Sequence, residues 1–298
     1  MGLFAYSFPW ARSDSETREG QSTPHRPSSA PEGPEEMRLH YGAASIYDPA
    51  RPLQSPSGHD GARKKTPVTP LNATPSPTLT VGFFLLPLIV GGLVVWAIRR
   101  TSGPTAGLWA AIGLSAWMAW VGGLAILGFL DQWNPPRMFL VFAAILVFLA
   151  WAARQPWTER LGTLPLAWLV GFQSFRIVVE ILLHAAVREG VAHPTMTWTG
   201  NNWDILPGIS ALLLCPFVQR IKPGTLQIWN ISMAGILVVT VGSAMLSAPT
   251  PFRQIMGDPA NSFVARFPFV WLPAVLVTSA WLGHVVLFRR LRRESSEE

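Results

Sequence analysis

The sequence predicts an all-α fold, a polytopic bundle of about seven transmembrane helices that follows a long polar segment. Only 13% of the 298 residues are charged, against roughly 25% in soluble domains. The chain is 49% hydrophobic, and its 14 tryptophans suit the interface between membrane and water. From Leu79 onward, apolar segments recur that are long enough to cross a bilayer, which takes about 20 residues.

Seven apolar segments are predicted to be membrane-spanning helices, because a backbone within hydrocarbon must satisfy its own hydrogen bonds. They lie at 79–98, 106–130, 138–153, 164–187, 204–219, 227–247 and 267–288, and together they form a predicted domain over 79–288. The third and fifth segments are short for a full crossing. Pro207 and Pro216 lie within the fifth, so a kinked or partly spanning helix is the alternative there. Residues 289–298 are predicted to be a charged cytoplasmic tail.

The basic residues are distributed unequally between the two sides of this bundle. One side collects Arg99, Arg100, Arg154, Arg160, Arg220, Lys222, Arg289, Arg290, Arg292 and Arg293. The other side has Arg137, Arg188, Arg253 and Arg266, accompanied by Asp131, Glu189 and Asp258. Because Lys and Arg are enriched in cytoplasmic loops, we predict an external N-terminus and a cytoplasmic C-terminus, in the plasma (inner) membrane of a bacterium.

Residues 1–78 are rich in Pro, Ser, Gly and Thr and show no sustained apolar period. Such a segment buries too little surface to offset its ordering entropy, so we predict a disordered N-terminal tail. The predicted orientation places this tail outside, although its first residues do not resemble a signal peptide. Two interpretations follow: a tail that is translocated, or a native start of translation nearer the first helix. We favour the second.

The composition argues against several classes of function. A net charge of +6 would suggest nucleic acid as a partner of a soluble protein, but here the basic residues flank apolar segments. Cys215 is the single cysteine, so neither a disulfide framework nor a cysteine-rich metal site is expected. No lysine lies in the last helix, where a retinal protein would need one for its Schiff base. We expect no metal, no cofactor and no nucleic acid.

Two more specific hypotheses fail because the residues that they require are predicted at different depths in the membrane. His184 is predicted near the outer end of its helix and His284 near the inner end of its own, so one haem cannot use both. The run Gly208-Ile209-Ser210-Ala211 is similar to the serine motif of rhomboid proteases. Ser210, however, is expected towards the outer face, out of reach of His284 as a base. These arguments lean against an enzyme.

The fourth predicted helix carries a polar stripe, which consists of Gln173, Arg176, Glu180 and His184. These residues are three or four positions apart and therefore share one face. An Arg or Glu within a membrane costs about 3 kcal/mol on insertion scales, so such residues face the protein interior. One interpretation is a polar pathway or binding site. The alternative is structural, with Arg176 and Glu180 neutralising each other and fastening the helix to its neighbours.

The loop between Arg188 and Asp204 is the second candidate, and it is predicted to lie outside. Asn201, Asn202 and Asp204 are its candidate binding residues. In the functional interpretation, the loop folds over the polar stripe as a lid or re-entrant segment. In the structural interpretation, Asp204 or Asn202 caps the fifth helix, and the tryptophans of the loop lie at the membrane interface.

The helix and the loop also carry a resemblance. The residues concerned are Phe175-Arg176 and Glu180, then Met196-Thr197 and Gly200-Asn201-Asn202-Trp203-Asp204-Ile205-Leu206. They resemble an uncharacterised family of bacterial polytopic membrane proteins, in which a helix with Arg and Glu precedes a Met-Thr-x-x-Gly-x-Asn-aromatic-Asp-Ile-Leu loop. The match covers roughly residues 164–211, with Trp203 where Phe is more usual. The family has no known activity, so the resemblance implies that stripe and loop form one unit and implies no reaction.

These observations favour an integral membrane protein that transports or binds a small solute, an ion or a lipid headgroup through the polar stripe. The alternative is a non-catalytic membrane subunit or assembly factor with a structural Arg176–Glu180 pair, and a membrane-embedded enzyme comes third. The lipid bilayer is the expected partner, and the sequence does not predict an oligomeric state. Water access to the fourth helix would separate the first two hypotheses, because a pathway is wet and a packing contact is dry.

Overall fold

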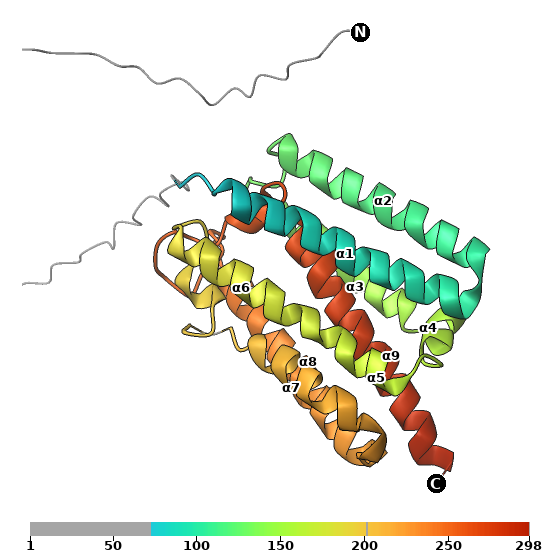
Figure 1. The fold of residues 1–298 in the computed structure, drawn as a ribbon. Helices are drawn as coiled ribbons and strands as arrows, with labels where there is room; N and C mark the ends of the chain where they lie inside the picture. Colours follow the sequence, from blue (N-terminus) through green and yellow to red (C-terminus); the bar gives the residue numbers. More distant parts are fainter. Residues whose placement is uncertain (1–72, 201, 298) are drawn as a thin grey trace, which may run out of the picture. The chain divides into compact units, whose positions relative to one another are not determined.

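The computed structural model describes residues 73–200 and 202–297. Within these ranges every named element is a helix and no β-strand is present, so the predicted all-α fold is confirmed (Figure 1). The predicted tail up to position 72 lies outside the described residues, as do Asn201 and Glu298.

The helices coincide with the apolar segments of the sequence. Single helices are α1 (Pro77–Ser102), α2 (Pro104–Ile126), α3 (Met138–Ala152) and α8 (Pro223–Ser247). Composite helices are α5 (Leu166–Gly171) with η1 (Phe172–Ser174) and α6 (Phe175–Arg188), α7 (Ile205–Leu214) with η3 (Cys215–Arg220), and η5 (Leu272–Val277) with α9 (Thr278–Glu297). Shorter helices in the connections are α4 (Pro156–Leu161), η2 (Pro194–Met196) and η4 (Phe263–Ala265).

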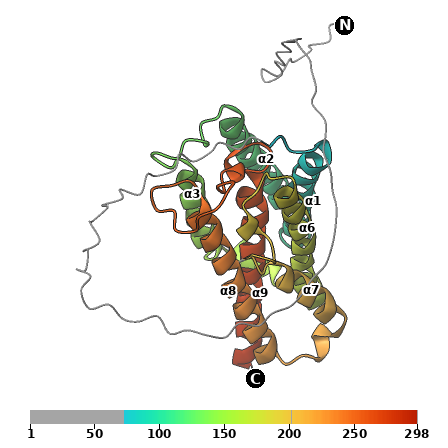
Figure 2. The same cartoon turned by 90° about the vertical axis from the view of Figure 1, so that its left-hand side faces the viewer.

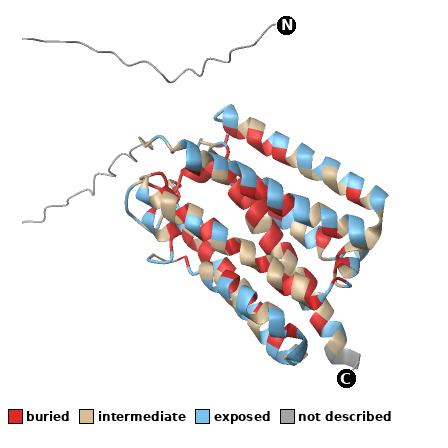
Figure 3. Ribbon diagram, viewed as in Figure 1, coloured by how far each residue is buried: buried red, intermediate tan, exposed pale blue. Residues whose placement is uncertain are grey.

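Five helical segments of the described chain are long and apolar enough to cross a membrane. They are Pro77–Ser102, Pro104–Ile126, Leu166–Arg188, Pro223–Ser247 and Leu272–Glu294, while Met138–Ala152 and Ile205–Arg220 are apolar but shorter. Large apolar side chains such as Leu108, Ile126 and Val147 are exposed. Exposed positions recur along the helices of the bundle (Figure 3). So much exposed apolar surface fits a membrane protein. The number of crossings stays a prediction.

The bundle is built around α9, whose membrane-length segment is the most buried of the five (Figure 2). The start of α1 and the loops that follow α2, α6 and α8 lie at one end, here called the loop end (Figure 1). The α1–α2 turn, α4 and the C-terminal end of α9 lie at the other. That end carries the larger group of basic residues found in the sequence and is called the basic end.

Local sequence sets the ends of α1. Proline opens this helix, and its fixed φ and missing N–H suit a first turn. Ser76 caps it, because its Oγ accepts a hydrogen bond from the backbone N of Leu79 at 3.2 Å. The Glu189 carboxylate accepts two hydrogen bonds from Ser76, from its backbone N at 2.8 Å and from its Oγ at 2.7 Å. At the other end Gly103 has φ 92°, which lets α1 turn directly into α2.

The segment that leads into α9 is a π-helix with Pro273 near its start. A widened turn and a proline leave backbone carbonyls without their usual partners. Two side chains supply them: Trp117 Nε1 donates to Ala274 O at 3.1 Å, and Thr278 Oγ1 donates to Pro273 O at 3.1 Å. Trp271 Nε1 donates in turn to Met118 O at 3.0 Å. The two tryptophan bonds join the π segment and the residue before it to α2.

The last helix differs from its predicted bounds at both ends. It begins at Leu272, because residues 267–270 form turns. It continues to Glu297, so the predicted charged tail is a helical extension. Arg289 in this extension donates to Ala153 O at 2.7 Å and is ion-paired with Glu159. The extension is thereby tied to α4.

Candidate functional site

Arg176 is the centre of a buried polar network. It lies in α6 and is 1% exposed. Its guanidinium binds the Asp204 carboxylate in a bidentate manner, with Nε 2.9 Å from Oδ2 and Nη2 bonded to Oδ1. The third nitrogen, Nη1, is 3.1 Å from His284 Nε2. One arginine therefore joins α6 to the start of α7 and to α9.

The hydrogen-bond partners fix the state of His284. Arginine has no acceptor, so His284 Nε2 must accept from Arg176 and carries no proton. The proton is then on Nδ1, which donates to Asn230 Oδ1 at 2.8 Å. Asn230 Nδ2 donates back to the backbone O of His284 at 3.1 Å. A neutral His284 with a single tautomer satisfies the whole arrangement, and it ties α8 into the network.

Glu180 is held by the loop and not by Arg176. Its Oε1 accepts from the backbone N of Trp198 at 2.7 Å, and its Oε2 accepts from Asn202 Nδ2 at 2.9 Å. Among the described residues, the acidic partner of Arg176 is Asp204. The predicted Arg176–Glu180 pair is therefore wrong. A carboxylate from the next helix offers two oxygens in the plane of the guanidinium, which is the stronger geometry.

Asn202 joins the two charged centres. Its Nδ2 donates to Glu180 and also to Met196 O at 2.9 Å. Its Oδ1 accepts from the backbone N of Asp204 at 3.0 Å and from Thr240 Oγ1 at 3.0 Å. Both donors and both acceptors of one amide are thus used. The side chain is 1% exposed, so each of these bonds is shielded from water.

The loop folds over part of the polar stripe, as one sequence interpretation predicted. Asp204 occupies the N-cap position of α7 but makes no capping bond, because its carboxylate binds Arg176. The capping interpretation of Asp204 is therefore wrong. Trp198 and Trp203 are more than half exposed, as side chains at a membrane interface can be.

The loop also holds a buried histidine. Burial, and then the charge of Arg253, lower the pKa of His193. Its Nδ1 is therefore free of a proton and accepts a hydrogen bond from the backbone N of Thr195.

The remaining predicted residues lie apart from this network. Gln173 Nε2 donates to Ala280 O at 3.1 Å, and its buried Oε1 has no hydrogen-bond partner. His184 is half-buried, and its Nδ1 has no partner. Asn201 lies outside the described residues. Of the predicted set, the structure brings together Arg176, Glu180, Asn202 and Asp204.

Sequence reasoning did not assign three members of the network: His284, Asn230 and Thr240. His284 was considered only as a haem ligand or a base for Ser210, whose hydroxyl instead donates to Leu206 O. Asn230 and Thr240 are polar residues within the apolar helix α8. Polar side chains in such a segment face the bundle interior, and this was the available signal.

A small cavity adjoins the network and limits what it can hold. Its volume is about 60 Å³, and its polar lining includes Asn202, Asp204 and Thr240. A buried water needs roughly 10–15 Å³ by this measure, so the cavity has room for a few waters or a small ion. In this conformation an organic solute does not fit.

Comparisons of the chain with protein-family models, with curated proteins and with solved structures find no match. The functional argument therefore rests on the geometry of the site.

Proposed function

We propose that this membrane protein binds and conducts a small cation, foremost the proton, through the network around Arg176. The observation that carries the proposal is the buried chain Glu180–Asn202–Asp204–Arg176–His284, in which Arg176, Glu180 and His284 lie on helices of membrane length. Ionisable residues at such positions are costly and mark ion pathways and proton relays. The small volume of the adjoining cavity argues against a larger solute or a lipid headgroup in this conformation.

The proposal includes a topology of seven crossings, with the N-terminus outside and the C-terminus in the cytoplasm of a bacterial cell. The placement of most basic residues at the basic end supports it. In this arrangement the two shorter helices would also cross, and the loop between α6 and α7 would face the outside. The resemblance to the uncharacterised bacterial family stays a prediction.

The topology predicts opposite locations for two reporter fusions. A reporter that is active only in the cytoplasm should be active after Arg293 and inactive within the loop between α6 and α7. A reporter that is active only outside should give the reverse result. Activity of one reporter at both positions would contradict an odd number of crossings between them and remove the seven-helix topology.

Proton conduction predicts a loss on replacing His284 with Gln. Glutamine can still accept from Arg176 and donate to Asn230, but it does not titrate. In vesicles that enclose a pH-sensitive dye, the full chain should dissipate an imposed pH gradient clearly faster than protein-free vesicles. His284→Gln should lower that rate about tenfold or more, because a carboxamide cannot take up a proton at one nitrogen and release it from the other, as an imidazole does.

The matched control is His193→Gln, which makes the same change outside the network and should keep the rate. A wild-type rate equal to that of protein-free vesicles would exclude proton conduction.

A structural role is the second candidate, and the saturation of the network favours it. Both carboxylates, the guanidinium and the Asn202 amide have partners within the chain. A membrane subunit or assembly factor would use such bonds to hold α6, α7, α8 and α9 together. In that case no proton flux is expected, and His284→Gln should leave both stability and the cellular phenotype unchanged.

A further inference from the structure

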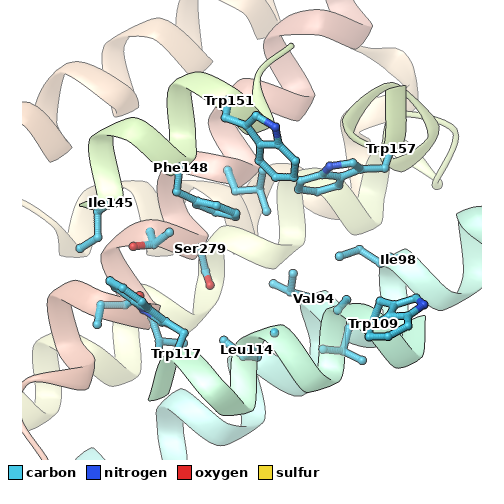
Figure 4. A pocket seen from close by; sticks show the side chains of 18 of the residues that line it. Val94, Ile98, Trp109, Leu114, Trp117, Ile145, Phe148, Trp151, Trp157 and Ser279 are labelled. Atoms are coloured by element: carbon cyan, nitrogen blue, oxygen red, sulfur yellow. The ribbon is translucent and has the colours of Figure 1, made fainter. Parts of the chain in front are cut away.

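A second and much larger cavity lies away from the polar network. It has a volume of about 570 Å³ and is enclosed by α1, α2, α3, α4 and the η5–α9 helix (Figure 4). The lining includes Trp109, Gly113, Trp117, Trp151, Thr278 and Ser279. Cavities of this size hold small-molecule ligands.

The lining selects an apolar occupant. Thr278 and Ser279 are its only residues with side-chain hydroxyls, and the Thr278 hydroxyl already donates to Pro273 O. Four indole rings and a set of aliphatic side chains make up most of the remaining wall. Water in such a space would find too few hydrogen-bond partners, and apolar cavities of this kind stay dry or bind hydrocarbon.

The cavity reaches the outer surface near the basic end. Trp109 and Trp151 both line it and are 67% and 51% exposed. Trp109 is in the second turn of α2, and Trp151 is in the last turn of α3. These two exposed indoles mark the edge of the cavity that faces the region occupied by lipid around a membrane protein.

Three arginines lie close in sequence to lining residues at this end of the cavity. Arg154 follows Trp151 by three residues and is exposed. Arg99 packs against Gly107, where an added Cβ would lie 3.0 Å from its Cα, and Gly107 is two residues before Trp109. Arg100 is the exposed neighbour of Arg99. Within the described ranges, none of these three arginines forms an ion pair with an acidic side chain.

We infer that the cavity binds one acyl chain of an anionic phospholipid, whose phosphate is held by Arg99, Arg100 and Arg154. Bilayer hydrocarbon is as apolar as the cavity wall, so the chain alone gains little by entering. The preference must come from the headgroup, and basic residues at a membrane surface favour anionic lipids. This site is independent of the network around Arg176.

The chain offers a matched pair of glycines for the test. Gly113 and Gly123 both lie in α2, and at both an added Cβ would meet no atom within 4 Å. Gly113 lines the cavity and Gly123 does not. Gly113→Leu should therefore fill the cavity, and Gly123→Leu should add the same bulk elsewhere with the same gain in helix propensity.

The experiment measures lipids that remain bound to the purified full chain in native mass spectrometry. After equal exposure to phosphatidylglycerol and phosphatidylcholine, the wild type and Gly123→Leu should retain one phosphatidylglycerol in preference, by about tenfold. Gly113→Leu should lose this lipid. The triple variant Arg99→Gln/Arg100→Gln/Arg154→Gln should still bind lipid but without the preference.

Equal retention of the two lipids by the wild type would overturn the inference. So would undiminished phosphatidylglycerol on Gly113→Leu, because the lipid would then occupy another surface. Circular dichroism and gel filtration establish that each variant is folded before it is compared.

Discussion

Replacing Arg176 with Leu should lower the free energy of unfolding by about 3–5 kcal/mol, because the substitution leaves the buried Asp204 carboxylate without its counter-charge. Asp204→Leu should have a similar cost, since it leaves the guanidinium unpaired. The double variant should recover much of the loss, because two apolar side chains of similar volume replace the pair. Unfolding in detergent micelles, followed by circular dichroism, measures all three.

The informative comparison is with Glu180. Because Glu180 is bonded to Trp198 and Asn202 and not to Arg176, the double variant Arg176→Leu/Glu180→Leu should recover much less of the lost stability than Arg176→Leu/Asp204→Leu. Recovery of stability in Arg176→Leu/Glu180→Leu, without recovery in Arg176→Leu/Asp204→Leu, would contradict the pairing of Arg176 with Asp204. That result would instead support Glu180 as the partner of Arg176, which the spacing along the helix suggested.

Asn202→Asp should destabilise the protein by about 3 kcal/mol, at the upper end of the cost of an unsatisfied buried group. The change is nearly isosteric, but the donor that faces Glu180 and Met196 O becomes an acceptor. Two carboxylates would then meet, and they cannot both ionise at this separation. Thermal unfolding at neutral pH measures the deficit.

The deficit should shrink as the pH falls, because one shared proton restores a donor between the two carboxylates. Asn134→Asp makes the same change at an exposed position of the loop end and should be almost neutral at every pH. A deficit of Asn202→Asp that does not change with pH would show that shape, and not charge, decides the role of this residue.

The helices were predictable because bilayer-length apolar segments admit little else, and the structure places helices at all seven segments. The association of the stripe with its loop was also predictable, since Glu180 needed a partner and the loop offered donors. The partner of Arg176 could not be predicted in this way. Spacing along one helix favours an internal pair, whereas the choice between that pair and Asp204 depends on how neighbouring helices are rotated.

The depth of His284 in the membrane could not be predicted from the sequence either. His284 was placed near the inner end of its helix by counting residues, whereas the structure has it bonded to Arg176 on a neighbouring helix. The long side chain of arginine spans part of such a difference. The membrane-length segment also runs from Leu272 to Glu294 and not over 267–288, so His284 lies near its middle, as Arg176 does in Leu166–Arg188.

The π segment before α9 changes the angular phase of the helix that follows. An α-helix turns by about 100° per residue, so a turn widened by one residue rotates everything beyond it by that angle. Leu272 and Leu276 pack with Phe83 near the loop end, while Leu282 and Val286 pack with Leu169 in a different cluster. One helix thus presents two differently oriented faces along its length, and His284 belongs to the second. His284 lies beyond the π segment, so the direction of its ring depends on that turn as well as on its bonds to Arg176 and Asn230.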